Sequence, residues 1–345
     1  MTRKLAIHLR VQSSLPMPEL MALMRDIEAA GFDGAGVVDS QMLARDCFVV
    51  LGQAAMQTSR MALFPAVTNP FTRHASVLAS AIRTVEEMAP DRTRFIMGTG
   101  YTSASTIGRK AAKLSEMRDS IAAVKTLLEG KEVNWNGTPW KLEYGSDRRI
   151  PVLMAASGPK AIELAGEVAD GVLLLVGFNP GLLDWSMDHL ERGAKRAGRK
   201  VEDLEVIWAV RTGLGATMAE ARRRAQPTAV HWGLRWDGDW ARRATIRMPD
   251  IPIPEAVKAI KPDLSHAPDW EAAIAATDYL PKDIVAQLCD ALGLIGTPQH
   301  CAQRLIAMEK LGARNIYLMP TTTPEAELRA FREVVFPLLE KAGLR

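Results

Sequence analysis

A run of small and amide-bearing residues follows an apolar segment early in the chain and could hold a planar ligand. The apolar segment covers residues 61–65, and the residues after it are Ala66, Val67, Thr68 and Asn69. A strand that ends in such residues can present backbone and side-chain hydrogen-bond donors to a flat ring. These four residues are therefore candidate cofactor-binding residues.

A second junction has the composition of an anion-binding helix start. Its residues, which continue an apolar run, are Ala156, Ser157, Gly158, Pro159 and Lys160. Glycine lets the backbone approach a ligand closely, and proline at the first helical position forfeits no hydrogen bond. A capped helix without any ligand would have the same pattern. Two such junctions in one chain favour a cofactor with a flat head and a phosphorylated tail.

The segment Gly98-Thr99-Gly100 resembles the start of a dinucleotide-binding fingerprint. The third glycine of that fingerprint is missing, because Ser103 stands in its place. The glycines would instead let the backbone pass beside a flat ring, with the Thr99 hydroxyl and the Gly100 backbone near it. A tight turn between a strand and a helix is the simpler interpretation.

Two titratable residues lie on or at the end of expected strands. Asp39 could accept a proton or bind a substrate hydroxyl, or it could cap the turn that follows. His8 could act as an acid or base if its side chain points into the mouth of a barrel; otherwise it is a core histidine. The six histidines show no metal-ligand spacing, so we expect no metal site. Without an evident nucleophilic triad, the chemistry would be left to a cofactor.

Short apolar runs alternate with amphipathic segments along the chain, which is typical of repeated βα units. The expected strands are Leu5–Leu9, Gly34–Asp39, Met61–Val67, Arg94–Gly98, Pro151–Ala156, Gly171–Val176, Leu204–Arg211 and Asn315–Pro320. Between them, stripes such as Leu20, Leu23, Met24 and Ile27 have helical spacing. Eight strands with intervening helices predict an α/β fold, a (β/α)8 TIM barrel, with a doubly wound open sheet as the alternative. No linker divides the chain, so residues 1–345 are expected to form a single domain.

An insertion before the last strand, at about residues 231–280, interrupts this alternation. It has no clear strand and contains four of the eight tryptophans, Trp232, Trp236, Trp240 and Trp270. Long insertions at the C-terminal face of a barrel frame the active site. The segment is therefore either a helical flap packed on the barrel or a lid over the substrate.

Composition narrows the classes of protein and partner. The 345 residues are 48% hydrophobic, and the formal net charge is only +3, which does not favour a nucleic-acid partner. Cys47, Cys289 and Cys301 are widely spaced, as expected for buried, reduced thiols. No signal segment or long apolar span is evident, so we expect a cytoplasmic protein that does not contact a membrane.

Taken in order, several motifs resemble the bacterial luciferase-like flavin-dependent oxidoreductase superfamily. They are Val67-Thr68-Asn69-Pro70-Phe71-Thr72-Arg73-His74, Gly98-Thr99-Gly100 with Gly108-Arg109-Lys110, Ala156-Ser157-Gly158-Pro159-Lys160, Ala169-Asp170-Gly171-Val172 and Gly296-Thr297-Pro298. The branch that they resemble most contains the methylenetetrahydromethanopterin reductase that depends on coenzyme F420. Where that branch often has an acidic residue after the glycine turn, this chain has Tyr101. Where the branch often has Asp-His after the second strand, this chain has Asp39-Ser40.

The resemblance implies a (β/α)8 barrel that binds FMN or coenzyme F420 at the C-terminal ends of its strands. It places a bulge or a non-prolyl cis peptide at Ala66-Val67-Thr68, behind the ring. It places the phosphate at Ser157-Gly158-Pro159-Lys160, with Gly177 close to the tail. It also implies a homodimer formed through barrel helices.

The resemblance implies a flavin-dependent oxidoreductase, and three functions follow from it. The leading expectation is a monooxygenase in which reduced FMN, supplied by a separate flavin reductase, reacts with oxygen to oxidise a small organic substrate. The alternative is hydride transfer to or from coenzyme F420, which needs no oxygen. A third possibility is a relative that binds a flavin without catalysis.

Overall fold

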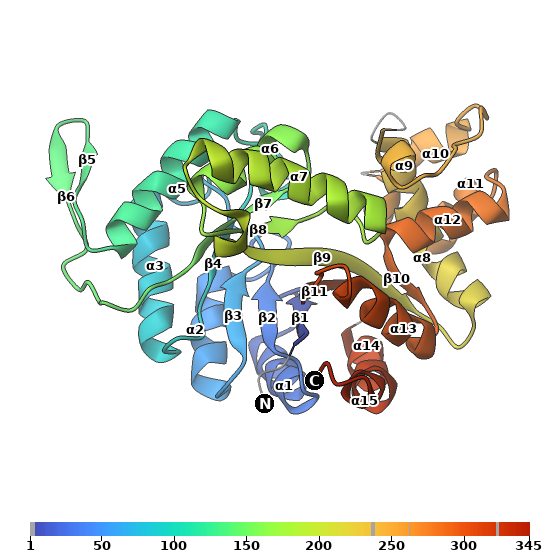
Figure 1. The fold of residues 1–345 in the computed structure, drawn as a ribbon, viewed down its shortest axis with the longest axis horizontal. Helices are drawn as coiled ribbons and strands as arrows, with labels where there is room; N and C mark the ends of the chain where they lie inside the picture. The colour runs from blue at the N-terminus through green and yellow to red at the C-terminus, as the bar shows by residue number, and fades with distance from the viewer. Residues whose placement is uncertain (1–3, 236–238, 262, 322–323) are drawn as a thin grey trace. The chain divides into compact units, whose positions relative to one another are not determined.

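A computed structural model of the chain describes residues 4–235, 239–261, 263–321 and 324–345 (Figure 1). The chain divides into two compact units. The N-terminal unit comprises Ala6–Leu175 and Asp188–Ile207. The C-terminal unit comprises Met1–Leu5, Val176–Met187 and Trp208–Arg345.

Parallel strands buried on both faces form the sheet of the N-terminal unit. They are β1 (Ala6–Val11), β2 (Gly34–Val37), β3 (Ala62–Pro65), β4 (Phe95–Met97), β7 (Val152–Ala156) and β8 (Gly171–Leu174). β2 pairs with β1 and β3, and β7 pairs with β4 and β8. Two parallel bridges, Leu63 to Thr93 and Thr68 to Met97, join the chain segments of β3 and β4. Burial on both faces explains the continuous apolar sequences of these strands.

Consecutive helices of the N-terminal unit lie against one another beside this sheet. They are α1 (Met17–Ala29), α2 (Cys47–Gln57), α3 (Ala75–Met88), α4 (Tyr101–Ser105), α5 (Leu114–Leu128) and α6 (Pro159–Val168). α2 contacts α1 and α3, and α5 contacts α3 and α6. As predicted, α1 buries Leu20, Leu23, Met24 and Ile27. An antiparallel hairpin, β5 (Val133–Trp135) and β6 (Thr138–Trp140), projects beside α3 and α5 (Figure 1).

The C-terminal unit holds two more parallel strands. β9 (Glu205–Leu214) continues into it from the N-terminal unit and pairs with β10 (Gly293–Gly296) and β11 (Asn315–Pro320). The helix α7 (Pro180–Arg196) also runs from one unit into the other. The 3-10 turn Val201–Asp203 precedes β9.

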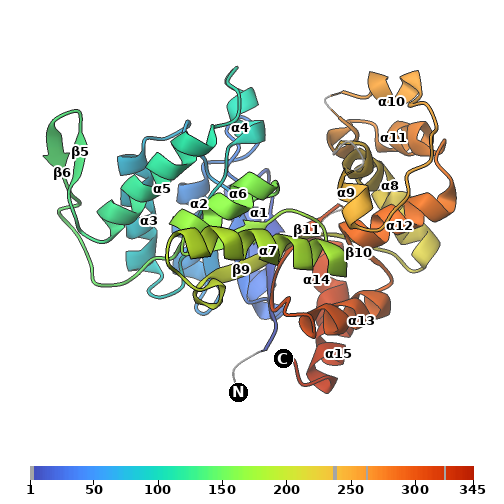
Figure 2. The same cartoon turned by 45° about the horizontal axis from the view of Figure 1, so that its top comes forward.

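Helices make up the rest of the C-terminal unit (Figure 2). They are α8 (Met218–Arg235), α9 (Asp239–Arg243), α10 (Glu255–Ala259), α11 (Trp270–Thr277), α12 (Lys282–Leu292), α13 (Pro298–Glu309), α14 (Pro324–Ala330) and α15 (Phe336–Lys341). A 3-10 turn, Leu264–His266, precedes α11, and a π-helical turn, Phe331–Val335, joins α14 to α15.

The insertion at residues 231–280 is helical wherever the structure describes it. The indole N–H of Trp240 donates to the carbonyl oxygen of Val176 (2.6 Å), and that of Trp270 donates to the carbonyl oxygen of Arg224 (3.0 Å). Trp232 packs against the hydrophobic cluster of this unit, and Trp236 lies outside the described residues. Packing therefore accounts for the placement of the described tryptophans, and the lid remains a prediction.

The order of strands and helices is that of a (β/α)8 barrel, as predicted, and not of an open sheet. Each of the eight expected strands coincides with one of β1, β2, β3, β4, β7, β8, β9 and β11. The sequence analysis did not foresee β10 or the β5–β6 hairpin. The single domain stays a prediction.

The three cysteines are free and buried, as expected. In the part of the chain that the structure describes, no helix is both long and apolar enough to cross a membrane.

Candidate functional site

The segments that follow β3 and β4 meet at the residues expected to lie behind a planar ring. The peptide bond between Ala66 and Val67 is cis, where the resemblance implies a bulge or a cis bond. The Thr68 amide donates to the Ile96 carbonyl oxygen (3.1 Å), and the Gly98 amide donates to the Thr68 carbonyl oxygen (2.9 Å). A Cβ on Gly98 would lie 2.8 Å from Cγ2 of Val67. The absence of a side chain at position 98 therefore lets the two segments pack together.

The hydroxyl of Thr68 is a buried polar group that no described residue satisfies. The side chain is fully buried, and its Oγ1 has no hydrogen-bond partner among the described residues. A buried polar atom left in this state costs about 1–3 kcal/mol. A bound group that hydrogen-bonds to this hydroxyl would remove that cost, so the residue fits a ligand-binding position.

Asn69 joins the loops that follow β3 and β4. Its side-chain oxygen accepts hydrogen bonds from the amides of Phe71 (2.9 Å) and Thr72 (3.0 Å). Its Nδ2 donates to Oγ1 of Thr72 (3.0 Å) and Oγ of Ser103 (2.9 Å). Gly100, which has a left-handed φ of 75°, packs so closely that a Cβ there would lie 2.7 Å from Cβ of Asn69. The side chain of Asn69 is thus satisfied by protein, which gives it a positioning role instead of the expected ligand contact.

Asp39 is buried just beyond β2 and forms an ion pair with Arg73. The distance between Nη1 of Arg73 and Oδ2 of Asp39 is 2.7 Å, and Nη2 of the same guanidinium lies 2.5 Å from Oδ2 of Asp46. Asp46 in turn caps α2 by accepting from the amides of Phe48 and Val49. Burial lowers the pKa of Arg73, but the two carboxylates raise it more, so the net change is upward. Asp39 is therefore an acceptor held by an arginine, and Asp46 is the residue that caps the helix.

His8 is buried in the middle of β1, on the same face of the sheet as Gly34 and Phe64. Its ring meets that of Phe64 edge-on, with 5.5 Å between centroids. His8 is in register with Gly34, whereas Asp39 lies five residues further along that strand direction. At about 3.3 Å per residue, this separates the two levels by roughly 16 Å along the strands. The structure therefore does not bring His8 and Asp39, the two expected proton-transfer residues, to one point.

The start of α6 directly after β7 is open, as the anion-binding interpretation requires. Ser157 and Gly158 are half-buried, and Pro159 and Lys160 are exposed. Gly158 is the N-cap and provides no capping side chain, and nothing lies within 4 Å of the place where its Cβ would be. The first amides of a helix have no acceptor within the helix, and they attract negative charge. Together with the Ser157 hydroxyl and the Lys160 ammonium, they make a site that fits a phosphate.

Gly177, expected near the cofactor tail, is used for packing. Its φ of 100° suits glycine, and the residue is buried. A Cβ would lie 2.6 Å from the carbonyl oxygen of Ala291 and 3.2 Å from the ring of Trp240. The protein itself therefore explains the glycine, and we do not include Gly177 in the candidate site.

Two further side chains order the loops of the N-terminal unit: Gln41, which sequence reasoning missed, and Arg109, which it named only within the Gly108-Arg109-Lys110 motif. Nε2 of Gln41 donates to the Ser103 carbonyl oxygen (2.5 Å) and to Oγ1 of Thr106 (2.8 Å). The guanidinium of Arg109 stacks over the ring of Phe71, 4.1 Å from its centroid. Neither residue has a spacing in the sequence that would reveal its partner.

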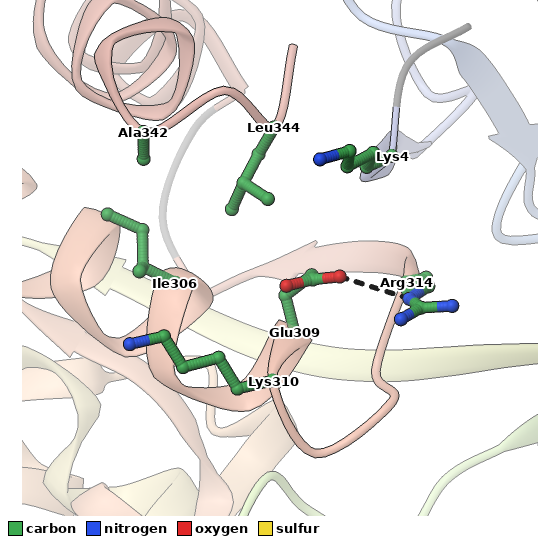
Figure 3. A pocket seen from close by; sticks show the side chains of 7 residues that line it. All are labelled: Lys4, Ile306, Glu309, Lys310, Arg314, Ala342 and Leu344. Carbon is green, nitrogen blue, oxygen red and sulfur yellow. Dashed lines mark hydrogen bonds and ion pairs between the residues drawn. The ribbon is translucent and has the colours of Figure 1, made fainter.

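The C-terminal unit contains a cavity of about 670 Å³ (Figure 3). Its lining residues are Lys4, Ile306, Glu309, Lys310, Arg314, Ala342 and Leu344. Glu309 and Arg314 are paired across 3.0 Å, and Lys4 and Leu344 point toward the centre of the view. No expected site residue lines this cavity. The described residues also contain no group of three His, Cys, Asp or Glu side chains that could hold a metal ion.

Comparisons with known proteins agree with the motifs. Residues 5–315 match the family model described as luciferase-like monooxygenase. The chain is 28% identical to the 5,10-methylenetetrahydromethanopterin reductase of Methanolobus tindarius over 313 residues, which cover 87% of this chain and 89% of that protein. It is 27% identical to the F420-dependent glucose-6-phosphate dehydrogenase of Nakamurella multipartita over 194 residues, which cover 53% and 56% of the two chains.

Solved structures share the fold. The coenzyme F420 dependent tetrahydromethanopterin reductase from Methanopyrus kandleri superposes with a TM-score of 0.78 at 21% identity, over 97% of this chain and 99% of that chain. An F420-dependent secondary alcohol dehydrogenase gives a TM-score of 0.71 at 16% identity, over 99% of each chain. Because the family model spans most of the sequence, the chain belongs to the luciferase-like monooxygenase family.

Proposed function

We propose that this chain is an oxidoreductase that binds coenzyme F420 and transfers hydride between it and a small organic substrate. Three of the relatives named above carry F420 dependence in their descriptions and align with half or more of the chain, and a fourth is a reductase that aligns with 87% of it. This support favours the alternative from the sequence analysis over its leading expectation, the monooxygenase that uses FMN.

The open start of α6 is the observation that carries the proposal. The amides of its first turn, the Ser157 hydroxyl and the Lys160 ammonium would hold the phosphate of the coenzyme. Gly158 keeps this space free, since a larger side chain would occupy it. Pro159 starts the helix without removing a useful donor, and buried Ala156 ends β7 beneath the phosphate site.

The segments after β3 and β4 would bind the ring. Ala66, Val67 and Thr68 would lie behind it, with the Thr68 hydroxyl available for a hydrogen bond. Thr99 and Gly100 would border it, while Asn69 holds their loop against that of β3. When bound, coenzyme F420 supplies the hydride donor or acceptor of the reaction. The protein's part is to position the ring and to exclude water from it.

We assign Asp39 the role of accepting a proton from the substrate or binding its hydroxyl group. It lies beyond the end of β2, at the level where a (β/α)8 barrel carries its catalytic groups. Arg73 fixes one of its oxygens, which leaves the other as an acceptor. His8, deeper along β1, would act through an intervening group.

Binding and turnover separate the candidate functions. The purified protein is titrated with F420 and with FMN, each oxidised and reduced, while absorbance and fluorescence are followed. Micromolar binding of F420, with weaker binding of FMN, is expected. Preference for reduced FMN, with oxygen consumed, would instead establish the second candidate, the monooxygenase that the family description suggests and that requires a separate flavin reductase. Binding of either cofactor without turnover of a broad substrate panel would indicate a non-catalytic relative.

We also propose that the chain forms a homodimer through α2 and α3. These neighbouring helices expose Val49, Met56, Val77 and Met88, and Glu87 is the one charged residue that α2 and α3 expose. Exposed apolar patches of this kind are common in protein interfaces. Light scattering should give twice the chain mass, and Val49→Glu with Met56→Glu should give the monomer. Leu311→Glu, at an exposed leucine of the other unit, is the control.

A further inference from the structure

Large apolar side chains are exposed on two loops of the N-terminal unit. Met42 is 72% exposed and Leu43 is 53% exposed, in the loop between β2 and α2. Tyr101 is 61% exposed at the start of α4, and Ile107 follows that helix and is also exposed. Single apolar residues at a surface are ordinary, but four such residues on two loops form a patch of the kind found at ligand or partner sites.

The two loops are held together by hydrogen bonds. Gln41, next to Met42, donates to the Ser103 carbonyl oxygen and to Oγ1 of Thr106, both close to Tyr101 in the chain. Asn69 donates to the side chain of the same Ser103. The patch is therefore tied to the loop of β3, where the proposed ring site lies.

Met42 has a left-handed backbone, with a φ of 68°. Only glycine, and to a lesser degree asparagine or aspartate, adopts this conformation readily. A long apolar side chain at such a position is stabilised by neither its backbone nor its burial. Residues in such conformations concentrate at functional sites, which agrees with a role for the exposed methionine.

Three charged groups near the patch are engaged by protein, whereas Lys110, three residues after Ile107, is exposed. Arg109 stacks on Phe71, and Arg45 donates to the carbonyl oxygen of Ser14 (2.6 Å). Asp39 is paired with Arg73. The four residues of the patch thus present mainly apolar surface, and none of them carries a charge.

We infer that Met42, Leu43, Tyr101 and Ile107 form the apolar wall of the substrate site, and that the substrate is a neutral apolar or aromatic compound. The inference rests on the proposed function, since it takes the ring site beside these loops to be the reaction centre. None of the four wall residues carries a positive charge that would bind a phosphorylated or polycarboxylate substrate.

Direct binding tests the wall without relying on catalysis. The probes are 2-naphthol, which is neutral and aromatic, and glucose 6-phosphate, which is anionic; calorimetry measures each with and without bound F420. The variant Leu43→Gln with Tyr101→Ser removes apolar surface from the wall. The matched control is Leu311→Gln with Tyr144→Ser, whose leucine is 54% and whose tyrosine is 46% exposed elsewhere.

We expect 2-naphthol to bind at least 10-fold more tightly than glucose 6-phosphate. The wall variant should weaken 2-naphthol binding at least 5-fold, with the midpoint of urea unfolding and the F420 affinity preserved, whereas the control should change neither affinity. Equal effects of the two variants, or tighter binding of glucose 6-phosphate, would overturn the inference. So would a change from dimer to monomer in the wall variant, because it would assign the patch to a second copy of the chain. If the wild type binds 2-naphthol at this wall but does not bind F420, the result contradicts the proposed function and still supports the apolar wall.

Discussion

The imidazole of His8 occupies the space that a side chain at Gly34 would need. A Cβ at position 34 would lie 2.2 Å from Nδ1 of His8 and 2.9 Å from the carbonyl oxygen of Ala62. His8 and Gly34 are partners in the register of β1 and β2. The imidazole thus fits within the sheet because the neighbouring strand has no side chain at that level.

We expect Gly34→Ala to lower the free energy of unfolding by about 2–3 kcal/mol, because an added methyl group overpacks a buried site. In a His8→Ala background the same change should cost only about 1 kcal/mol, since one of the two close contacts is gone. Urea denaturation of the four proteins measures both costs. Gly145→Ala is the control, because its Cβ would meet only ordinary contacts at 3.8 Å. Equal costs in the two backgrounds would contradict the relationship.

Gly158→Asp should separate the stability of α6 from its binding of the coenzyme. Aspartate is a better N-cap than glycine by a few tenths of a kcal/mol, so the unfolding free energy should hold or rise. The same carboxylate would repel a phosphate at the first turn, so the F420 affinity should fall at least 10-fold. Fluorescence titration measures the F420 affinity, and urea denaturation measures the unfolding free energy.

Gly145→Asp makes the same change of charge at an exposed glycine of the same unit and should leave both quantities unchanged. If Gly158→Asp binds F420 as the wild type does, the phosphate does not lie at the start of α6.

The hydrogen bond between Asn69 and Ser103 predicts that replacing either residue lowers the free energy of unfolding and that the two losses are not additive. Removing the four hydrogen bonds of Asn69 with Asn69→Ala should cost about 4 kcal/mol, since each contributes about 1 kcal/mol. Ser103→Ala removes one of these bonds and should cost about 1 kcal/mol alone, but much less when Asn69 is already alanine. Additive costs in the double variant would show that the two side chains do not interact.

The strands were predictable because each is a short apolar run that is buried on both faces and bounded by turn residues. β10 lacked that boundary, because α12 ends at Leu292 and the strand begins at Gly293. The strands of the β5–β6 hairpin are only three residues long and none of their residues is buried, so no apolar run marks them. Asn136 and Gly137 have φ values of 53° and 93°, which is the two-residue loop that joins antiparallel strands.

The site was predictable as a set of strand ends, but the partners within it were not. Asp39 and Arg73 are 34 residues apart, and no spacing rule relates the ends of separate strands. The expected ligand contact of Asn69 and the expected tail contact of Gly177 stay predictions, and each residue also has a role within the protein. The amide of Asn69 could bind a ligand, but it donates to Ser103. The missing side chain of Gly177 could leave room for a ligand, but Ala291 packs into that space.

Glu327 gives the protein a pH dependence that can be isolated. The residue is fully buried on α14, and burial raises the pKa of its carboxyl group from 4.5 to about 8. Below pH 4.5 the folded and unfolded chains both hold this proton. Between pH 4.5 and 8 the unfolded chain releases it and the folded chain keeps it, so the free energy of unfolding falls as the pH rises.

Each pH unit of that window is worth about 1.4 kcal/mol, which gives a loss of up to about 5 kcal/mol across it. Glu327→Gln has no proton to release, so its unfolding free energy should fall less between pH 5 and 8 than that of the wild type. At pH 8 it should be the more stable protein, because the unfolded wild type gains from ionising. Urea denaturation at pH 5, 6.5 and 8 measures the difference, with Glu333→Gln as an exposed control. Parallel pH profiles for wild type and Glu327→Gln would mean that the carboxyl group is ionised in the folded protein at neutral pH.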